Sequence, residues 1–193
     1  MMDSELAPGV LGAVDSEILE ASRMRKFKRG HAEVRGIVDA PIDQVWELLT
    51  DWAGLLRWWV KPEDGGRPGP DLASVELVGG PQDVPRTRVV RHVTGSMVDE
   101  TLLLQNNETR RIYYDMVYRP NPGGAVLRSE FENYLATTVL DTLPDGKTLM
   151  TFKAEFDVVE PADLDLMRSI IERTWTDGIL QGYRRYFAKA QTA

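Results

Sequence analysis

The 193-residue sequence contains no cysteine and only two histidines. Disulfides, thiolate nucleophiles and cysteine-ligated zinc are therefore excluded, and little remains for a histidine-based metal site. The sequence also lacks a glycine-rich phosphate loop, a nucleophile elbow and a dinucleotide-binding fingerprint. We therefore expect no bound metal and no cofactor.

Long apolar runs are absent too, because no stretch approaches the ~20 apolar residues that a membrane-spanning helix needs. The first residues carry Asp3 and Glu5, whereas a secretory signal would be basic and then apolar. A formal net charge of -7 argues against general binding to nucleic acid or to anionic membranes. These features predict a cytoplasmic protein with neither nucleic acid nor integral membrane association.

The clearest local pattern is a long helix from Ala162 to Ala190, preceded by Pro161. At about 1.5 Å per residue it would run roughly 40 Å, so its apolar stripe needs a large surface to lie on. The stripe consists of Leu164, Met167, Ile170, Ile171, Trp175, Ile179, Tyr183, Tyr186 and Phe187.

Small residues follow one another along one face of this helix at Thr174, Gly178 and Gly182. Each glycine costs about 1 kcal/mol relative to alanine inside a helix, so something must need the space. The glycines either allow close packing of the helix or leave volume for a bound molecule beneath it.

Residues 1–30 form an N-terminal extension, separate from a main domain at residues 31–190. Asp15 or Ser16 could cap a short helix that continues through Phe27, with a basic cluster toward its end. Such a cluster fits the helix dipole, and contact with phosphate or a lipid surface is the alternative.

The main domain opens with a strand at His31–Val38, and Pro41 then starts a helix. A second short helical segment follows at 53–59, and residues 62–70 form a loop. Six further strands alternate with turn signals, at 72–78, 86–93, 97–105, 110–118, 125–140 and 149–159. The sequence therefore predicts an α+β fold, in which a curved antiparallel sheet of seven strands grips the long C-terminal helix.

The segment from Ala40 to Trp52, together with Trp58 and Trp59, resembles the opening of the helix-grip superfamily. This superfamily includes START lipid-transfer domains, the birch pollen allergen family and polyketide cyclase/dehydrase and lipid transport proteins. The resemblance covers residues 31–190. It implies a cavity between sheet and helix that holds a hydrophobic or aromatic small molecule.

Strand alternation gives candidate residues for such a cavity. Glu100 shares one side of its strand with Leu102 and Leu104, and this side should point inward. The candidate ligand-binding residues are Trp59, Arg88, Val90, Leu102, Tyr114, Met116, Ala136, Phe152, Thr174 and Gly178.

Glu100 and Tyr134 correspond to inward polar positions in the plant abscisic acid receptors, which the sequence also resembles. In those receptors the pair helps to hold the ligand. Their ligand-pairing lysine has no counterpart here, because Lys61 lies in the predicted loop, and their gate sequences are absent. This departure puts a carboxylate-binding site of their kind in doubt.

Both sides of the predicted strand at 86–93 carry arginine as well as valine, so the pattern does not determine which side faces the cavity. If Arg88, Val90 and His92 face inward, the cavity gains a cationic and a titratable group. His92 is either catalytic or a solvated side chain. Glu100 is either a functional group of the cavity or a structural carboxylate paired with an arginine.

Three functions follow from these features. The first is a carrier or sensor of a hydrophobic or aromatic molecule, and the second is a cofactor-independent cyclase, dehydratase or lyase. The second function would use Glu100, Tyr134 and His92 for acid–base catalysis. The third is a partner-binding protein that uses exposed tryptophans at 52, 58 and 59, and a homodimer is a possible assembly.

Overall fold

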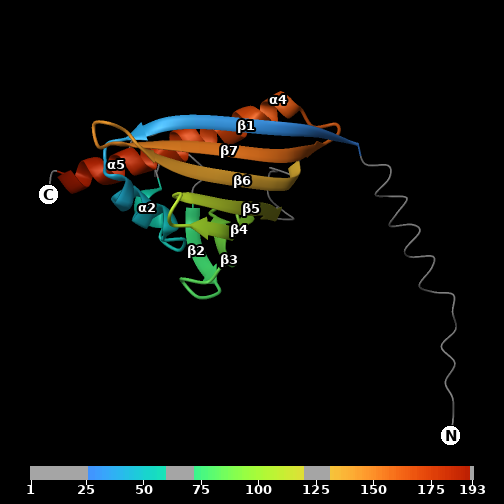
Figure 1. Cartoon of the computed structure of the whole chain (residues 1–193). Coiled ribbons are helices and arrows are strands. Elements are labelled where there is room, and N and C mark those ends of the chain that lie inside the picture. The colour runs from blue at the N-terminus through green and yellow to red at the C-terminus, as the bar shows by residue number, and fades with distance from the viewer. Residues whose placement is uncertain (1–25, 60–71, 120–130, 192–193) are drawn as a thin grey trace, which may run out of the picture.

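The computed structural model describes residues 26–59, 72–119 and 131–191 (Figure 1). In this part of the chain, seven strands form one antiparallel sheet in the order β1-β7-β6-β5-β4-β3-β2. The strands are β1 (Phe27–Val38), β2 (Leu72–Val78), β3 (Arg86–His92), β4 (Met97–Asn106), β5 (Arg111–Arg119), β6 (Phe131–Thr142) and β7 (Thr148–Val159). The predicted α+β architecture is confirmed.

Strand β1 begins at Phe27, four residues before the predicted start. It pairs with β7 along its whole length, from Phe27 opposite Val159 to Val38 opposite Thr148. Phe27–Gly30 therefore belongs to the sheet, whereas the sequence assigned it to the N-terminal extension. The predicted N-terminal helix ends in error at Phe27, which is in β1, and its residues up to 25 lie outside the described residues. The loop at 62–70 and the first part of the predicted strand 125–140 lie outside them too.

Two short helices follow β1 as predicted, α2 (Ile42–Thr50) and α3 (Leu55–Trp58). Helix α2 buries one apolar side, which includes Val45 and Trp46, against the sheet. Trp58 and Trp52 are also buried, at 6% and 3% exposure. These tryptophans belong to the core, so they offer no exposed surface for a partner protein.

The C-terminal helix is continuous but not uniform. It consists of α4 (Leu164–Arg173), a π-helical segment η2 (Thr174–Leu180) and α5 (Gln181–Gln191). The carboxylate of Asp163 accepts hydrogen bonds from the backbone N–H groups of Asp165 and Leu166, which caps the first turn. The helix therefore begins at Leu164, two residues after the predicted start.

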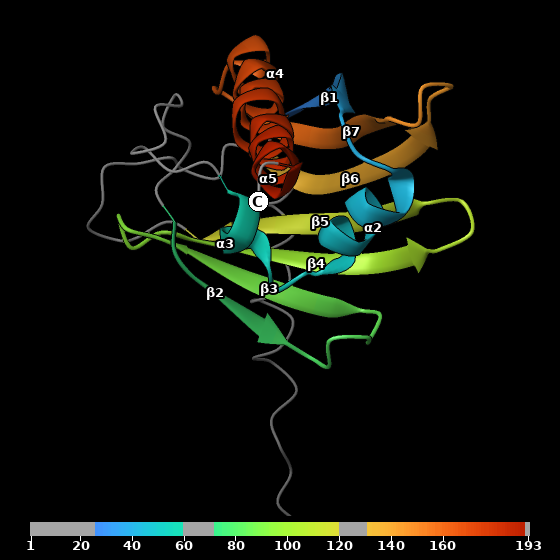
Figure 2. The same ribbon diagram turned by 90° about the vertical axis from the view of Figure 1, so that its left-hand side faces the viewer.

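The helix and the sheet enclose the core. Figure 2 views the helix nearly along its axis, with the sheet curving round it and α3 beside α5. Helix α4 and the η2 segment contact β1, whereas α5 also contacts α3. The core fills the concave side with residues that alternate along the strands, such as Ala32, Leu102, Ile112, Phe152 and Phe156.

The sheet has register shifts in β4 and β6, and of these two the one in β4 changes the predicted facing of a side chain. In β4 the pairing with β5 shifts between Leu102 and Leu104, so Leu104 is 43% exposed rather than inward as predicted. In β6 the pairing with β7 shifts between Glu132 and Leu135, and Asn133 there adopts a φ of 52°. Both are β-bulges, which insert an extra residue into one strand of a pair. Tyr134 and Ala136 in β6 are nevertheless buried, as their alternation predicted.

Candidate functional site

A cavity of about 160 Å³ lies between the sheet, the short helix α3 and the C-terminal helix. Its walls are largely apolar and aromatic. The lining residues are Leu55, Trp59, Leu72, Arg88, Val90, His92, Val98, Glu100, Tyr114, Met116, Tyr118, Tyr134, Met167, Ile170, Ile171, Thr174, Trp175 and Ile179. A predominantly apolar lining with a few polar groups is the usual composition of a small-molecule site.

An ion pair forms the charged part of this lining. Arg88 on β3 lies opposite Glu100 on β4, and its Nε and Nη2 groups both contact the Oε2 atom of Glu100. The guanidinium carbon of Arg88 also lies 3.9 Å from the centre of the Trp52 ring, and the indole Nε1 of Trp52 donates to the backbone oxygen of Glu100 at 3.2 Å. Trp52 thus supports both partners of the pair.

The structure bears on two questions that the sequence left open. Arg88, Val90 and His92 line the cavity, so this side of β3 faces inward. Glu100 is paired with an arginine, and the side chains of Arg88 and Glu100 are only 9% and 17% exposed. A carboxylate held in this way is engaged by a fixed charge, which suits a structural role better than proton transfer.

Two buried tyrosines of the lining form an aromatic cluster. The rings of Tyr114 and Tyr134 are 6.5 Å apart, and Trp52 packs edge-on against Tyr114 at 5.6 Å. Burial raises the pKa of Tyr114 above its usual range, and the negative charge of Glu100 raises it further. Burial likewise raises the pKa of Tyr134. Both hydroxyls therefore remain protonated near neutral pH and can act as hydrogen-bond donors.

Tyr134 lines the cavity from within the bulge of β6. Asn133 adopts the left-handed conformation, and its Nδ2 donates to Oδ2 of Asp157 on β7 at 2.8 Å. Leu135, the residue after Tyr134, is 43% exposed, whereas Tyr134 is 5% exposed. Asparagine tolerates positive φ better than most residues, so the local sequence suits the bulge.

His92 is the third candidate catalytic residue, at the end of β3. It lines the cavity and is half-buried. Burial lowers the pKa of His92, and the nearby Glu100 partly opposes this shift. The imidazole is therefore neutral at pH 7 and lacks the charge of an acid catalyst.

The structure brings together most of the residues that the sequence singled out. The three candidate catalytic residues Glu100, Tyr134 and His92 all line the cavity, as do Trp59, Arg88, Val90, Tyr114, Met116 and Thr174. Leu102, Ala136, Phe152 and Gly178 are buried but are not part of the lining. They lie in the packed core around the cavity.

Gly178 illustrates this difference. A Cβ atom on Gly178 would lie 3.0 Å from the Trp59 ring, and one on Gly182 would clash with the backbone oxygen of Trp58. The glycines therefore let α3 approach the C-terminal helix closely. This is the packing interpretation rather than the ligand-volume interpretation.

The C-terminal helix supplies several lining residues that were not selected as ligand-binding, among them Met167, Ile171 and Trp175. They belong to the apolar stripe that predicted the helix. The stripe also contains residues outside the lining, such as Tyr183 and Phe187, so helical periodicity alone does not separate cavity wall from core.

No group of three or more histidine, aspartate or glutamate side chains suited to a metal ion occurs among the described residues. Within those same ranges, no helix is long and apolar enough to cross a membrane.

Known structures share this fold. Protein XoxI from Bacillus cereus superposes with a TM-score of 0.60 at 21% identity, covering 84% of this chain and 98% of its own. A protein from Thermobifida fusca gives 0.61 at 22% identity, with coverages of 81% and 92%. Ara h 8.0201 gives 0.61 at 17% identity, with coverages of 84% and 99%. These identities support a common fold and nothing finer.

The sequence itself gives the family. A search of curated proteins found no match. The profile of the family described as "Polyketide cyclase / dehydrase and lipid transport" matches residues 29–186, which is most of the chain and includes every strand and helix that lines the cavity. The protein is therefore a member of the polyketide cyclase/dehydrase and lipid transport family.

Proposed function

We propose that the protein binds a small hydrophobic or aromatic molecule in this cavity and acts as a carrier or sensor. The observation that carries the proposal is a largely apolar and aromatic lining whose ion pair and threonine hydroxyl already have partners inside the protein. Arg88 is bound to Glu100, and the hydroxyl of Thr174 donates to the backbone oxygen of Ile170 at 2.9 Å. The remaining walls offer aromatic and aliphatic surface to an apolar ligand.

The size of the cavity limits the ligand. A volume of about 160 Å³ is close to that of an engineered apolar cavity that takes benzene, and it is below the range of ~300–1,000 Å³ typical of drug-sized ligands. One or two aromatic rings, or a short aliphatic chain, match this space. A larger ligand would require the walls to move.

A cofactor-independent cyclase, dehydratase or lyase is the second candidate, and His92 is the observation in its favour. A neutral imidazole that faces the cavity could accept a proton from a bound substrate. Glu100 contributes less to such a reaction because Arg88 engages it. The two buried tyrosine hydroxyls would serve as donors to a substrate oxygen.

Calorimetric titration with indole and naphthalene tests the binding function. Met116→Trp adds a large side chain inside the cavity, so we expect indole affinity to fall at least tenfold. Val117→Trp is the matched control, because Val117 is the next residue on the same strand and is 56% exposed on the opposite face. It should bind indole as the parent does.

Two results would contradict the binding proposal: no aromatic probe binds, or Met116→Trp binds indole as tightly as the parent. Mass analysis of ligands recovered after incubation with the protein separates the two functions. An unchanged ligand supports the carrier or sensor. A product that disappears with His92→Gln supports the enzyme.

A further inference from the structure

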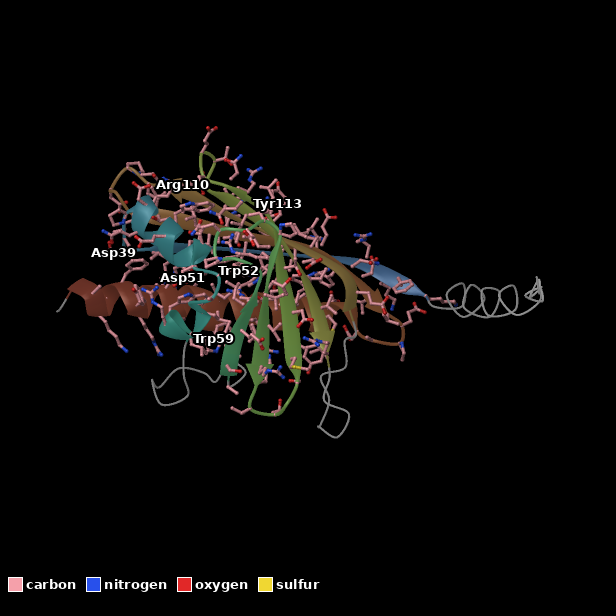
Figure 3. The ribbon with its side chains drawn as sticks, turned by 90° about the horizontal axis from the view of Figure 1, so that it is seen from below. Asp39, Asp51, Trp52, Trp59, Arg110 and Tyr113 are labelled. Carbon is pink, nitrogen blue, oxygen red and sulfur yellow. The ribbon has the colours of Figure 1, made fainter. Side chains whose placement is uncertain are left out.

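A second concave site lies on the other side of Trp59, between α3 and α5. It is a groove of about 410 Å³ lined by Arg57, Trp58, Trp59, Gly182, Arg185, Tyr186, Lys189 and Ala190. Trp59 lines both this groove and the cavity, so the two spaces are neighbours. Figure 3 shows Trp59 at α3, close to the C-terminal helix.

Several residues that line this groove carry buried hydrogen-bond donors without partners. Among the described residues, six buried side-chain atoms lack a hydrogen-bond partner, and three of them belong to residues of the groove. These three are the indole Nε1 atoms of Trp58 and Trp59 and the Nη1 atom of Arg185. Trp58 is 94% buried, since its exposed fraction is 6%.

All three atoms are N–H donors, and none can accept a hydrogen bond. A buried donor without an acceptor destabilises the protein, and a guanidinium N–H does so more than a neutral group. A water molecule accepts at most two hydrogen bonds and brings no negative charge. An oxyanion offers several acceptor positions and also compensates the charge of Arg185.

The charged side chains that line the groove are all positive. Arg57, Arg185 and Lys189 line it, and its described lining contains no acidic residue. Arg57 is already engaged, because its Nη1 donates to Asp51 at 2.5 Å and its Nη2 donates to the Tyr186 hydroxyl at 2.8 Å. Arg185, whose Nη1 has no partner, therefore adds positive potential to the groove in a chain whose net charge is -7.

The close approach of the two helices shapes this groove. Gly182 leaves room for the backbone of Trp58, and the Trp58 ring packs on Tyr183 with the ring centres 4.6 Å apart. Arg185 and Tyr186 follow within one helical turn of Gly182 and lie along the same groove. The aromatic walls and the close packing of α3 on α5 hold the N–H donors in place before any ligand binds.

We propose that this groove binds a small oxyanion, a carboxylate or phosphate group, through Arg185 and the indole N–H groups of Trp58 and Trp59. This inference does not depend on the proposed function of the cavity. The anion has two sources, a free anion or the head group of an amphipathic molecule whose apolar part occupies the cavity beyond Trp59.

Nuclear magnetic resonance of the ¹⁵N-labelled protein tests the proposal, because the chain has five tryptophans and each gives one indole N–H signal. Titration with inorganic phosphate or acetate at constant ionic strength should shift the signals of Trp58 and Trp59. The signals of Trp46 and Trp52 are internal controls, since both indoles already donate, to Asn107 and to the Glu100 backbone at 3.2 Å.

Two further ligands distinguish the sources of the anion. If phosphate and acetate shift Trp58 and Trp59, the groove takes free anions. If only octanoate shifts Trp58, while octan-1-ol does not, the groove takes the head group of an amphipathic ligand. If none of the three anions shifts either signal, the proposal is overturned.

Variants test the role of the guanidinium. Arg185→Gln removes the charge but keeps a donor, so we expect the anion affinity to fall about tenfold to hundredfold. Arg173→Gln is the matched control, because Arg173 is an exposed arginine of the same helix outside the groove. Lys189→Gln, at an exposed position, gives a second variant if Arg185→Gln does not fold, and it should weaken binding severalfold. Equal anion affinity in the parent and the folded groove variants would overturn the proposal.

Discussion

Glu100→Gln is the most informative substitution, because it breaks the ion pair that forms the charged part of the cavity. The substitution keeps the size of the side chain and one acceptor for Arg88, but it removes the negative charge. Arg88 is then left with an uncompensated charge in a site where its side chain is 9% exposed. Stability and ligand binding should respond differently to this change.

The expected loss of stability can be estimated from burial. Removing one partner of a buried ion pair costs about 3–5 kcal/mol. The amide oxygen of glutamine recovers about 1 kcal/mol through a neutral hydrogen bond to Arg88. The guanidinium also keeps its position 3.9 Å over the Trp52 ring. We therefore expect the free energy of unfolding to fall by about 2–4 kcal/mol.

Urea denaturation followed by tryptophan fluorescence measures this loss. Asp99→Asn is the matched control, because Asp99 is the adjacent residue of β4 and pairs with Arg119 where both side chains are more exposed, at 27% and 45%. That variant should lose no more than about 1 kcal/mol. The reasoning is refuted if Glu100→Gln costs no more than Asp99→Asn.

Binding provides the second readout of the same variant. If the cavity binds an apolar ligand, Glu100→Gln should keep indole affinity within about tenfold of the parent, provided that the variant is folded. If Glu100 instead acts as an acid or base, turnover of a substrate should fall about a hundredfold or more while binding persists.

Three further predictions concern single residues. Gly178→Leu should weaken indole binding at least tenfold in calorimetry, because its Cβ would lie 3.0 Å from Trp59 and displace that cavity wall; unchanged affinity would contradict this. Asn133→Val should be less stable in urea than Asn133→Gly by about 1–2 kcal/mol, since both lose the side-chain hydrogen bond but only valine is strained at a φ of 52°; equal stabilities would speak against strain. Burial lowers the pKa of His92 from 6.5, so below about pH 6.5 the unfolded chain binds a proton that the folded chain does not. The free energy of unfolding therefore decreases as the pH is lowered. Between pH 7.5 and 5.5 the parent should therefore lose more unfolding free energy than His92→Gln, and equal losses would count against a buried neutral imidazole.

The sequence was sufficient to predict the architecture because its periodicities are strong. Alternation in β1 places Ala32 and Val38 inward, and both are buried as expected. Proline at position 41 marks the start of α2, and the apolar stripe marks the C-terminal helix. These signals reflect burial of one face, which is local in the sequence and therefore readable from it.

The facing of β3 could not be predicted, because both of its sides mix arginine with valine. In the structure Arg88 faces inward and lies opposite Glu100 on β4. This pairing depends on the register between two strands, which no pattern within a single strand determines. The bulges at Leu103 and Asn133 were missed for a related reason. An inserted residue leaves no periodic trace in a short strand, and Leu104 was consequently expected on the wrong side.

Gly178 and Gly182 show which part of the site could not be predicted from the sequence. Their spacing indicated that the helix needed space on this face, but not which neighbour used it. The neighbours proved to be Trp58 and Trp59, more than a hundred residues earlier in the chain. Such a contact depends on how α3 docks, which no pattern within the helix records.

The π-helical segment Thr174–Leu180 bears on how the chain tolerates insertions and deletions. Each residue of an α-helix turns the chain by about 100°, so losing one residue within α4 would rotate everything beyond it by that angle. A segment with i→i+5 hydrogen bonds already contains surplus residues for its turns. Losing one residue there can be absorbed by a return to α-helical bonding, which leaves Tyr183 against Trp58. Length variation among related chains should therefore concentrate at 174–180 rather than elsewhere in this helix.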